Sequence, residues 1–234
     1  MRTVIYVPVI HTSADLGSLA KDVAKRGITD LGEDVWSKYR AAVEKFWDAI
    51  SDYFDPIDVS GMKIYQDGMV AGGEIGQRIV EEGVRSGSRN YKLVAGLLKR
   101  GAVLVKTEDY NLVKEERDRM VAITQAKSTV HKLFEFIKYK LAKDGILNKR
   151  DRFIAKRIDE TLSHGETGII FIGAYHNIKK WLPRSIRLSE IKDARKVREY
   201  QMLLPFCHKN KERFDELAEY LVSEIKEPFY RIEK

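Results

Sequence analysis

Apolar residues occur along the chain in two alternating patterns. Short, mostly apolar runs fall at residues 3–10, 62–66, 102–107 and 168–173, and a weaker one falls at 185–189. Such runs, bounded by turn-forming residues, are typical of buried strands. Between them, apolar residues recur every three or four positions, which indicates amphipathic helices. This alternation predicts an α/β fold with a largely parallel central sheet flanked by helices.

The helical pattern predicts nine helices. Gly27 and Gly101 stand where two of them are expected to end. Pro8, inside the first apolar run, predicts that this strand lies at a sheet edge or bends near its end. The helices are expected at residues 13–25, 33–52, 73–85, 89–100, 110–124, 128–143, 149–163, 190–203 and 209–226.

No repeat or low-complexity linker divides the chain. We therefore expect residues 1–234 to form a single α/β domain, in which about 110–145 could form a helical cap. With 44% hydrophobic and 33% charged residues, the composition excludes a disordered chain or a collagen. The single cysteine, Cys207, excludes a disulfide framework and favours a cytoplasmic location. No signal peptide and no apolar run of ~18 residues is found, so no membrane partner is expected.

The net charge of +7 is unevenly distributed. Residues 1–120 carry 18 Lys and Arg against 19 Asp and Glu, whereas residues 121–234 carry 24 against 16. A basic half raises the possibility of nucleic-acid binding, which would weaken steeply with salt. However, the basic residues are interleaved with acidic ones at helical spacing, as on solvated helix faces. A nucleic-acid partner is therefore not expected.

Polar side chains come after each of the first four predicted strands, at the edge where open parallel sheets bind ligands. His11 follows the first strand and His176 follows the fourth, each three residues after a Pro or Gly. A neutral imidazole can serve as a general base or a metal ligand, although each could instead cap a helix or lie in the core. The other candidate binding residues at strand ends are Gln66, Asp67, Glu108, Asp109 and Tyr175.

The acidic candidates leave alternatives open. Glu108 could act as a base, a metal ligand or a group that orients an imidazole. Asp109 should point to the opposite side of the chain and could instead cap the next helix. Asp67 precedes Gly68 and could be only a turn residue.

A charged pair, Arg150 and Asp151, is expected at the start of the helix that precedes the fourth strand. Arg150 could bind a carboxylate or phosphate, and Asp151 could favour the helix N-terminus electrostatically. Both could equally be exposed charges. The chain lacks the GxGxxG, GxxxxGK[ST], GxSxG and HExxH motifs. The glycine-rich segment 72–76 is interpreted as a turn, and adjacent Cys207 and His208 are not expected to form a catalytic pair.

Several of these segments together resemble a superfamily. They are the strand that ends in His11, the strand end at Glu108, the segment RDRFIA at 150–155, and GAYH at 173–176. This pattern resembles the superfamily of Tiki proteases, TraB pheromone-shutdown proteins, erythromycin esterases and haem-binding ChaN proteins. Pro8 stands where that superfamily has the glycine of its first motif. The resemblance implies an α/β fold, a site at the strand ends with Arg150 as the superfamily's arginine, and activities from metal-dependent proteolysis to ester hydrolysis or haem binding.

Our leading hypothesis is a hydrolase of a small molecule or peptide. In one version His11, His176 and Glu108 hold a divalent metal ion that activates water. In the other, a His or Glu acts as general base and Arg150 stabilises the oxyanion. The alternative is a non-enzymatic binding protein for haem, an anion or a nucleotide, with Tyr175 and Tyr65 as aromatic walls.

Overall fold

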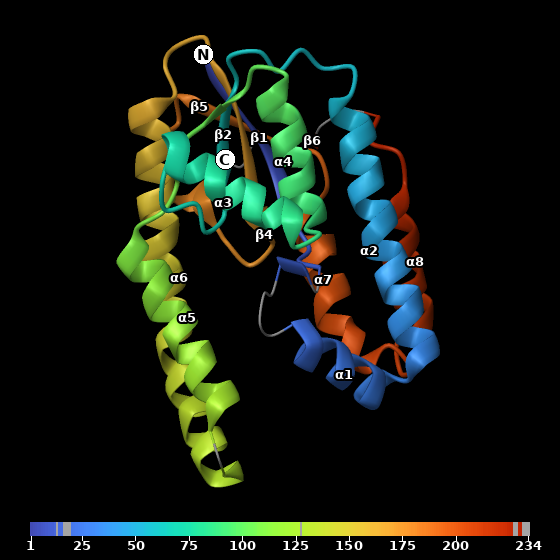
Figure 1. Cartoon of the computed structure of the whole chain (residues 1–234). Coiled ribbons are helices and arrows are strands. Elements are labelled where there is room, and N and C mark those ends of the chain that lie inside the picture. Colours follow the sequence, from blue (N-terminus) through green and yellow to red (C-terminus); the bar gives the residue numbers. More distant parts are fainter. Residues whose placement is uncertain (13, 16–19, 127, 227–228, 231–234) are drawn as a thin grey trace.

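Helices cover both faces of one central sheet (Figure 1). The computed structural model describes residues 1–12, 14–15, 20–126, 128–226 and 229–230. The strands are β1 (Arg2–Val9), β2 (Lys63–Gln66), β3 (Val103–Leu104), β4 (Thr167–Gly173), β5 (Ile186–Glu190) and β6 (Phe229–Tyr230). The α-helices are α1 (Ala20–Leu31), α2 (Glu33–Phe54), α3 (Gly73–Arg85), α4 (Arg89–Lys99), α5 (Tyr110–Gln125), α6 (Thr129–Thr161), α7 (Ala194–Leu203) and α8 (Lys211–Val222). The described residues include the 3₁₀ turns η2 (Ile178–Lys180) and η3 (Leu204–Phe206).

The sheet has the strand order β3-β2-β4-β1-β5-β6. The strands β1 to β5 are mutually parallel, and the short β6 pairs antiparallel with β5. The predicted α/β fold with a largely parallel sheet is therefore confirmed. The five predicted strands are all present, although β3 is only two residues long and β6 was not predicted.

The strands appear in the sequence as continuous apolar runs because both sheet faces are buried. In β1, Val7 and Val9 lie in one core, whereas Val4 and Tyr6 lie in the other. The first core is completed mainly by α2, α4, α7 and α8, and the second mainly by α6 and η2. Alternate residues of each strand thus contact different helices, as the period of two in a strand requires.

The connections that leave β1 and β4 cover opposite faces of the sheet. The path from β1 to β2 includes α2, which packs in the first core, and the path from β4 to β5 includes η2, which packs in the second. Adjacent strands whose connections diverge in this way leave a crevice outside their carboxyl ends, where ligands bind in open α/β sheets. The topology therefore places such a crevice between β1 and β4.

Pro8 does not lie at a sheet edge, so that one of the two alternatives was wrong. The strand β1 lies between β4 and β5, and Pro8 pairs with Ile172 of β4. Tyr6 accepts a hydrogen bond from the amide of Ile191 on the other side. Residues two apart in a strand turn their backbone groups to the same side, so the nitrogen of Pro8 also faces β5. It lies beyond Glu190, the last residue of β5, which pairs with Tyr6. No ladder hydrogen bond is lost, which is how an interior strand tolerates proline here.

The expected helix end at Gly27 was also wrong. Gly27 lies inside α1, and a Cβ atom there would come within 2.4 Å of the Trp36 ring. The glycine therefore permits close packing of α1 on α2, and the bend between them occurs at Gly32, where φ is +82°. The first helix was predicted at 13–25, and of this range Ser13 and residues 16–19 lie outside the described residues.

The two helices expected at 128–143 and 149–163 form one continuous helix, α6. Gly145 lies between the two predicted segments, but one glycine costs a helix only about 1 kcal/mol, which tertiary packing outweighs. The first half of α6 packs on α5, and Figure 1 shows this hairpin extending past the carboxyl ends of the strands. Its second half packs on the sheet through residues such as Ile154 and Ile158.

The last two helices begin later than expected, at Ala194 and Lys211. Glu190, where the first of them was expected to begin, is the last residue of β5, and Asp193 accepts a hydrogen bond from the amide of Arg195 as the cap of α7. Among the described helices, none combines the length and apolarity needed to cross a membrane.

Candidate functional site

The parallel register brings distant residues to one edge of the sheet. Val9, the last residue of β1, pairs with Gly173, the last residue of β4. Gln66, the last residue of β2, pairs with Phe171, and the next amide, that of Asp67, donates to the Phe171 carbonyl oxygen at 2.8 Å. The residues after these strands therefore emerge side by side in the crevice between β1 and β4.

Arg150 is the centre of a buried cluster of carboxylates. Its Nε donates to Glu108 Oε2 at 2.7 Å, and Nη2 donates to the second oxygen of Glu108 and, at 2.6 Å, to Asp67 Oδ1. Its Nη1 donates to Glu116 of α5. Glu108 is fully buried, and its Oε1 also accepts from the Gly68 amide at 2.9 Å. The guanidinium thus links the ends of β2 and β3 to α5 and α6 through charge-assisted hydrogen bonds.

Two neighbouring residues of α6, Arg150 and Asp151, bind different groups of the site. Ile154 and Ile158 of α6 pack on the sheet, which brings the preceding turn of the helix to the strand ends. Arg150 and Asp151 are consecutive, so their side chains leave the helix about 100° apart. Arg150 turns to Glu108, and Asp151 turns to His176. Asp151 thus lies within α6 rather than at its N-terminus, contrary to expectation.

His176 is held by Asp151 in a tight turn after β4. The His176 amide donates to the Gly173 carbonyl oxygen at 3.0 Å. The ring Nδ1 lies 2.6 Å from Asp151 Oδ1, and Asp151 Oδ2 accepts from the Asn177 amide at 2.8 Å. A carboxylate only accepts hydrogen bonds, so Nδ1 carries the proton. In the neutral ring the lone pair is then on Nε2, which lies 3.6 Å from Asp67 Oδ2.

Gly173 makes room for this arrangement. Its amide donates to Asp67 Oδ2 at 3.1 Å. A Cβ atom at Gly173 would lie 3.2 Å from that same oxygen and 3.6 Å from the His176 ring. A larger residue would therefore crowd the Asp67 carboxylate and its amide donor. Asp67 is both a turn residue, followed by Gly68 at φ +76°, and a member of the site.

The electrostatics of the site depend on burial and these contacts. Burial disfavours the charged His176 imidazole, but the Asp67 charge and the hydrogen bond to Asp151 raise its pKa overall. Burial disfavours the Asp67 anion, yet His176 and Arg150 hold the pKa of Asp67 well below its usual range. Burial raises the pKa of Glu108; its hydrogen bonds from Arg150 oppose that rise, and the nearby Asp67 charge adds to it.

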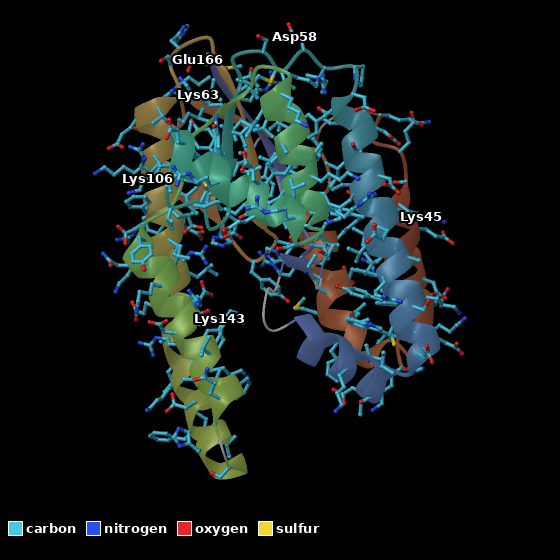
Figure 2. The ribbon with its side chains drawn as sticks, viewed as in Figure 1. Lys45, Asp58, Lys63, Lys106, Lys143 and Glu166 are labelled. Atoms are coloured by element: carbon cyan, nitrogen blue, oxygen red, sulfur yellow. The ribbon has the colours of Figure 1, made fainter. Side chains whose placement is uncertain are left out.

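A cavity of about 540 Å³ opens onto this cluster. His11 enters it from the end of β1 with an exposed side chain, and Tyr175 lies at its edge with 39% of its surface exposed. Lys143 of α6 lies over the Tyr175 ring, 4.9 Å from its centroid, and Figure 2 shows Lys143 on the side of the hairpin that faces α1 and α7. The polar residues that line the cavity include His11, Asp15, Gln66, Asp67, Asn90, Glu116, Arg117, Lys143, Arg150, Tyr175, His176 and Gln201.

Two predicted binding residues lie elsewhere. Asp109 caps α5, accepting hydrogen bonds from the amides of Asn111 and Leu112 at 2.9 and 3.2 Å. Its neighbour Glu108 points the opposite way, into the site. Tyr65 faces the second core, fully buried, with its hydroxyl 2.8 Å from Thr161 Oγ1. It therefore forms no wall of the cavity.

One of the three residues predicted to bind a metal ion has another partner in the structure. Both oxygens of Glu108 accept hydrogen bonds from Arg150, so this carboxylate is already engaged. Across the described part of the chain, no three His, Cys, Asp or Glu side chains are grouped as metal ligands. His11 and His176 do line the same cavity.

Several members of the site carry no signal in the sequence. Glu116 lies on α5 among other charged residues at helical spacing, a pattern typical of a solvated face. Asn90 and Gln201 follow no strand; they belong to α4 and α7 and reach the cavity only through tertiary packing.

Comparison of the chain with family models, curated proteins and solved structures finds no match. The resemblance to the Tiki, TraB, erythromycin esterase and ChaN superfamily therefore stays a prediction.

Proposed function

We propose that this protein is a hydrolase in which His176 takes a proton from a water molecule that attacks an ester or amide carbonyl. The observation that carries the proposal is the buried pair of Asp151 and His176 at the cavity, with Nδ1 fixed by Asp151. A carboxylate that holds one imidazole nitrogen orients the ring and stabilises the imidazolium formed on proton uptake.

His176 takes up the proton in the first step of this reaction. As the water oxygen bonds to the carbonyl carbon, its proton passes to His176 Nε2, and Asp151 and Asp67 balance the new positive charge. His176, or His11 from the end of β1, then returns a proton to the leaving group as the carbon–heteroatom bond breaks. Arg150 does not serve as oxyanion donor in this proposal, because its guanidinium nitrogens are engaged by Glu108, Asp67 and Glu116. It acts as a positioning residue.

The alternative is a non-enzymatic binding protein for haem, an anion or a nucleotide, which would use the same cavity. An oriented, buried Asp–His pair favours catalysis, since binding alone does not require a ring nitrogen held ready for a proton. Purified protein with a Soret band and no hydrolytic activity would favour the alternative.

The test is hydrolysis of a panel of nitrophenyl esters and nitroanilides by the wild type and by His176→Asn and Asp151→Asn. Loss of a general base lowers rates by on the order of 10²–10⁴, so we expect His176→Asn to lose at least about a hundredfold in kcat. His208→Asn is the control, because His208 lies outside the lining of the cavity. Wild-type rates in His176→Asn, or no turnover of any panel member by the wild type, would contradict the proposal.

A further inference from the structure

The acidic side chains of the cavity are satisfied within the protein. Asp67 and Glu116 are paired with Arg150. Asp15 accepts from the Thr12 amide at 2.6 Å and from the Thr12 hydroxyl at 2.8 Å, and it also binds Ser88. These carboxylates therefore have little capacity left for a cationic ligand.

Two cations that line the cavity have no carboxylate partner among the described residues. Arg117 comes from α5 and Lys143 from α6, so both belong to the hairpin wall. Lys143 lies over the face of the Tyr175 ring, which Arg198 also approaches, at 5.4 Å from the centroid. A wall with unpaired cations attracts a ligand group of negative charge.

Three amide side chains in the same cavity are incompletely hydrogen-bonded. The carbonyl oxygens of Gln66, Asn90 and Gln201 are inaccessible to solvent, and none has a hydrogen-bond partner in the described structure. Gln66 and Asn90 are each only 1% exposed as residues. Leaving such a group unpaired is unfavourable, so these amides indicate a polar ligand that completes their hydrogen bonds. Hydroxyl and amide groups do so, since each can donate and accept.

We infer that the substrate of this cavity is an anionic, hydroxyl- or amide-bearing ester or amide. Its carboxylate or phosphate binds Lys143 and Arg117 at the hairpin, and its hydroxyl or amide groups bind Gln66, Asn90 and Gln201. The inference rests on the proposed hydrolase function and names its substrate class. The charged group binds at the hairpin, which leaves the scissile carbonyl free to meet the water at His176.

The test measures binding, by calorimetry, of four small probes: acetate, glycerate, inorganic phosphate and glycerol 3-phosphate. We expect each hydroxylated probe to bind more tightly than its simple anion. The double variant Lys143→Gln, Arg117→Gln should lower the affinity for every probe that the wild type binds by about tenfold or more, because charge-assisted hydrogen bonds are lost. Gln66→Leu should weaken only the hydroxylated probes. The control is Lys140→Gln, on the same helix but outside the lining of the cavity.

The results with the different probes also distinguish a carboxylate from a phosphate, and the inferred substrate class from the proposed hydrolase function. Binding of glycerate alone identifies a carboxylate, and binding of glycerol 3-phosphate alone identifies a phosphate; either supports the inference. Absence of binding at about 50 mM, or wild-type affinity in the double variant, overturns it. Binding is measured again in His176→Asn, which should retain it. A protein that binds these anions but hydrolyses nothing refutes only the hydrolase, and one that hydrolyses neutral esters equally well refutes only the anionic substrate.

Discussion

His176 lies between two carboxylates, and its protonation depends on that position. Asp151 fixes the Nδ1 proton, and the Asp67 charge 3.6 Å from Nε2 stabilises the imidazolium. Both raise the pKa of His176 against the effect of burial. Because only the neutral ring accepts a proton from water, activity should rise with pH through a value above the usual histidine pKa of about 6.5.

Asp67→Asn is expected to move this acidic limb to lower pH. The substitution removes a negative charge that favours the imidazolium, so His176 loses its proton at lower pH. The measurement is kcat/KM against pH. Asp109→Asn is the control, since Asn also caps helices and this residue lies outside the cavity. An unchanged or raised limb in Asp67→Asn would contradict the assignment of His176 as the base.

Arg150→Met is expected to lower the free energy of unfolding by about 3–5 kcal/mol at pH 8, because Glu108 is then left as a fully buried, unpaired charge. Glu116→Gln should cost no more than about 1 kcal/mol, since Glu116 is only partly buried and the guanidinium retains Glu108 and Asp67. Urea denaturation measures both. Equal effects of the two substitutions would show that Arg150 does not serve mainly to neutralise Glu108.

At the residue scale, the sequence indicates the side chains that come directly after strand ends. His11, Asp67, Glu108 and His176 could be named because a parallel sheet collects the residues after its strands at one edge. Their contacts could not be named. That Glu108 binds Arg150 rather than an imidazole depends on the direction of α6, which the residue pattern along one helix does not specify.

Glycine marks helix ends at some positions of this chain and close contacts at others. Gly101, where a helix was expected to end, follows α4 at φ +92°. Gly27 was expected to do the same but lies inside α1 against Trp36. Gly145 lies inside α6, and a Cβ atom there would meet no atom of another element within 4 Å. The residue type is the same in each case, so only the packing of neighbouring elements distinguishes them.

These contacts predict opposite effects for two helical substitutions. Gly145→Ala should stabilise the protein by about 0.5–1 kcal/mol, because its Cβ would meet no atom within 4 Å and alanine favours helix. Gly83→Ala should destabilise it by about 1–3 kcal/mol, because its Cβ would lie 2.2 Å from the Tyr91 ring. Chemical denaturation measures both. Destabilisation by Gly145→Ala would mean that α6 is not continuous through this residue.

At the scale of the whole molecule, the hairpin of α5 and the first half of α6 differs from the sheet domain. None of the described side chains at 110–145 is buried, whereas the central strands are buried on both faces. Elements with few buried apolar contacts open at lower free energy. The hairpin is therefore expected to open without unfolding of the sheet.

Hydrogen exchange followed by mass spectrometry tests this expectation. Amides of 110–145 should exchange at least about a hundredfold faster than those of β1 and β4. The matched control is α8, an outer helix with Phe214, Leu217 and Leu221 buried, which should be protected more than the hairpin. Protection of the hairpin equal to that of the strands would show that it belongs to the same cooperative unit.

The hairpin supplies Arg117 and Lys143 to the cavity while adding no buried side chain among its described residues between 110 and 145. A segment of this kind can be exchanged for another with little cost to folding. Chimaeras that keep the sheet and the Asp151–His176 pair, but carry the hairpin of another protein with this fold, should show the ligand preference of that other protein. Replacing the hairpin alone is therefore expected to change which ligands the cavity binds, while the Asp151–His176 pair at the strand ends is left in place.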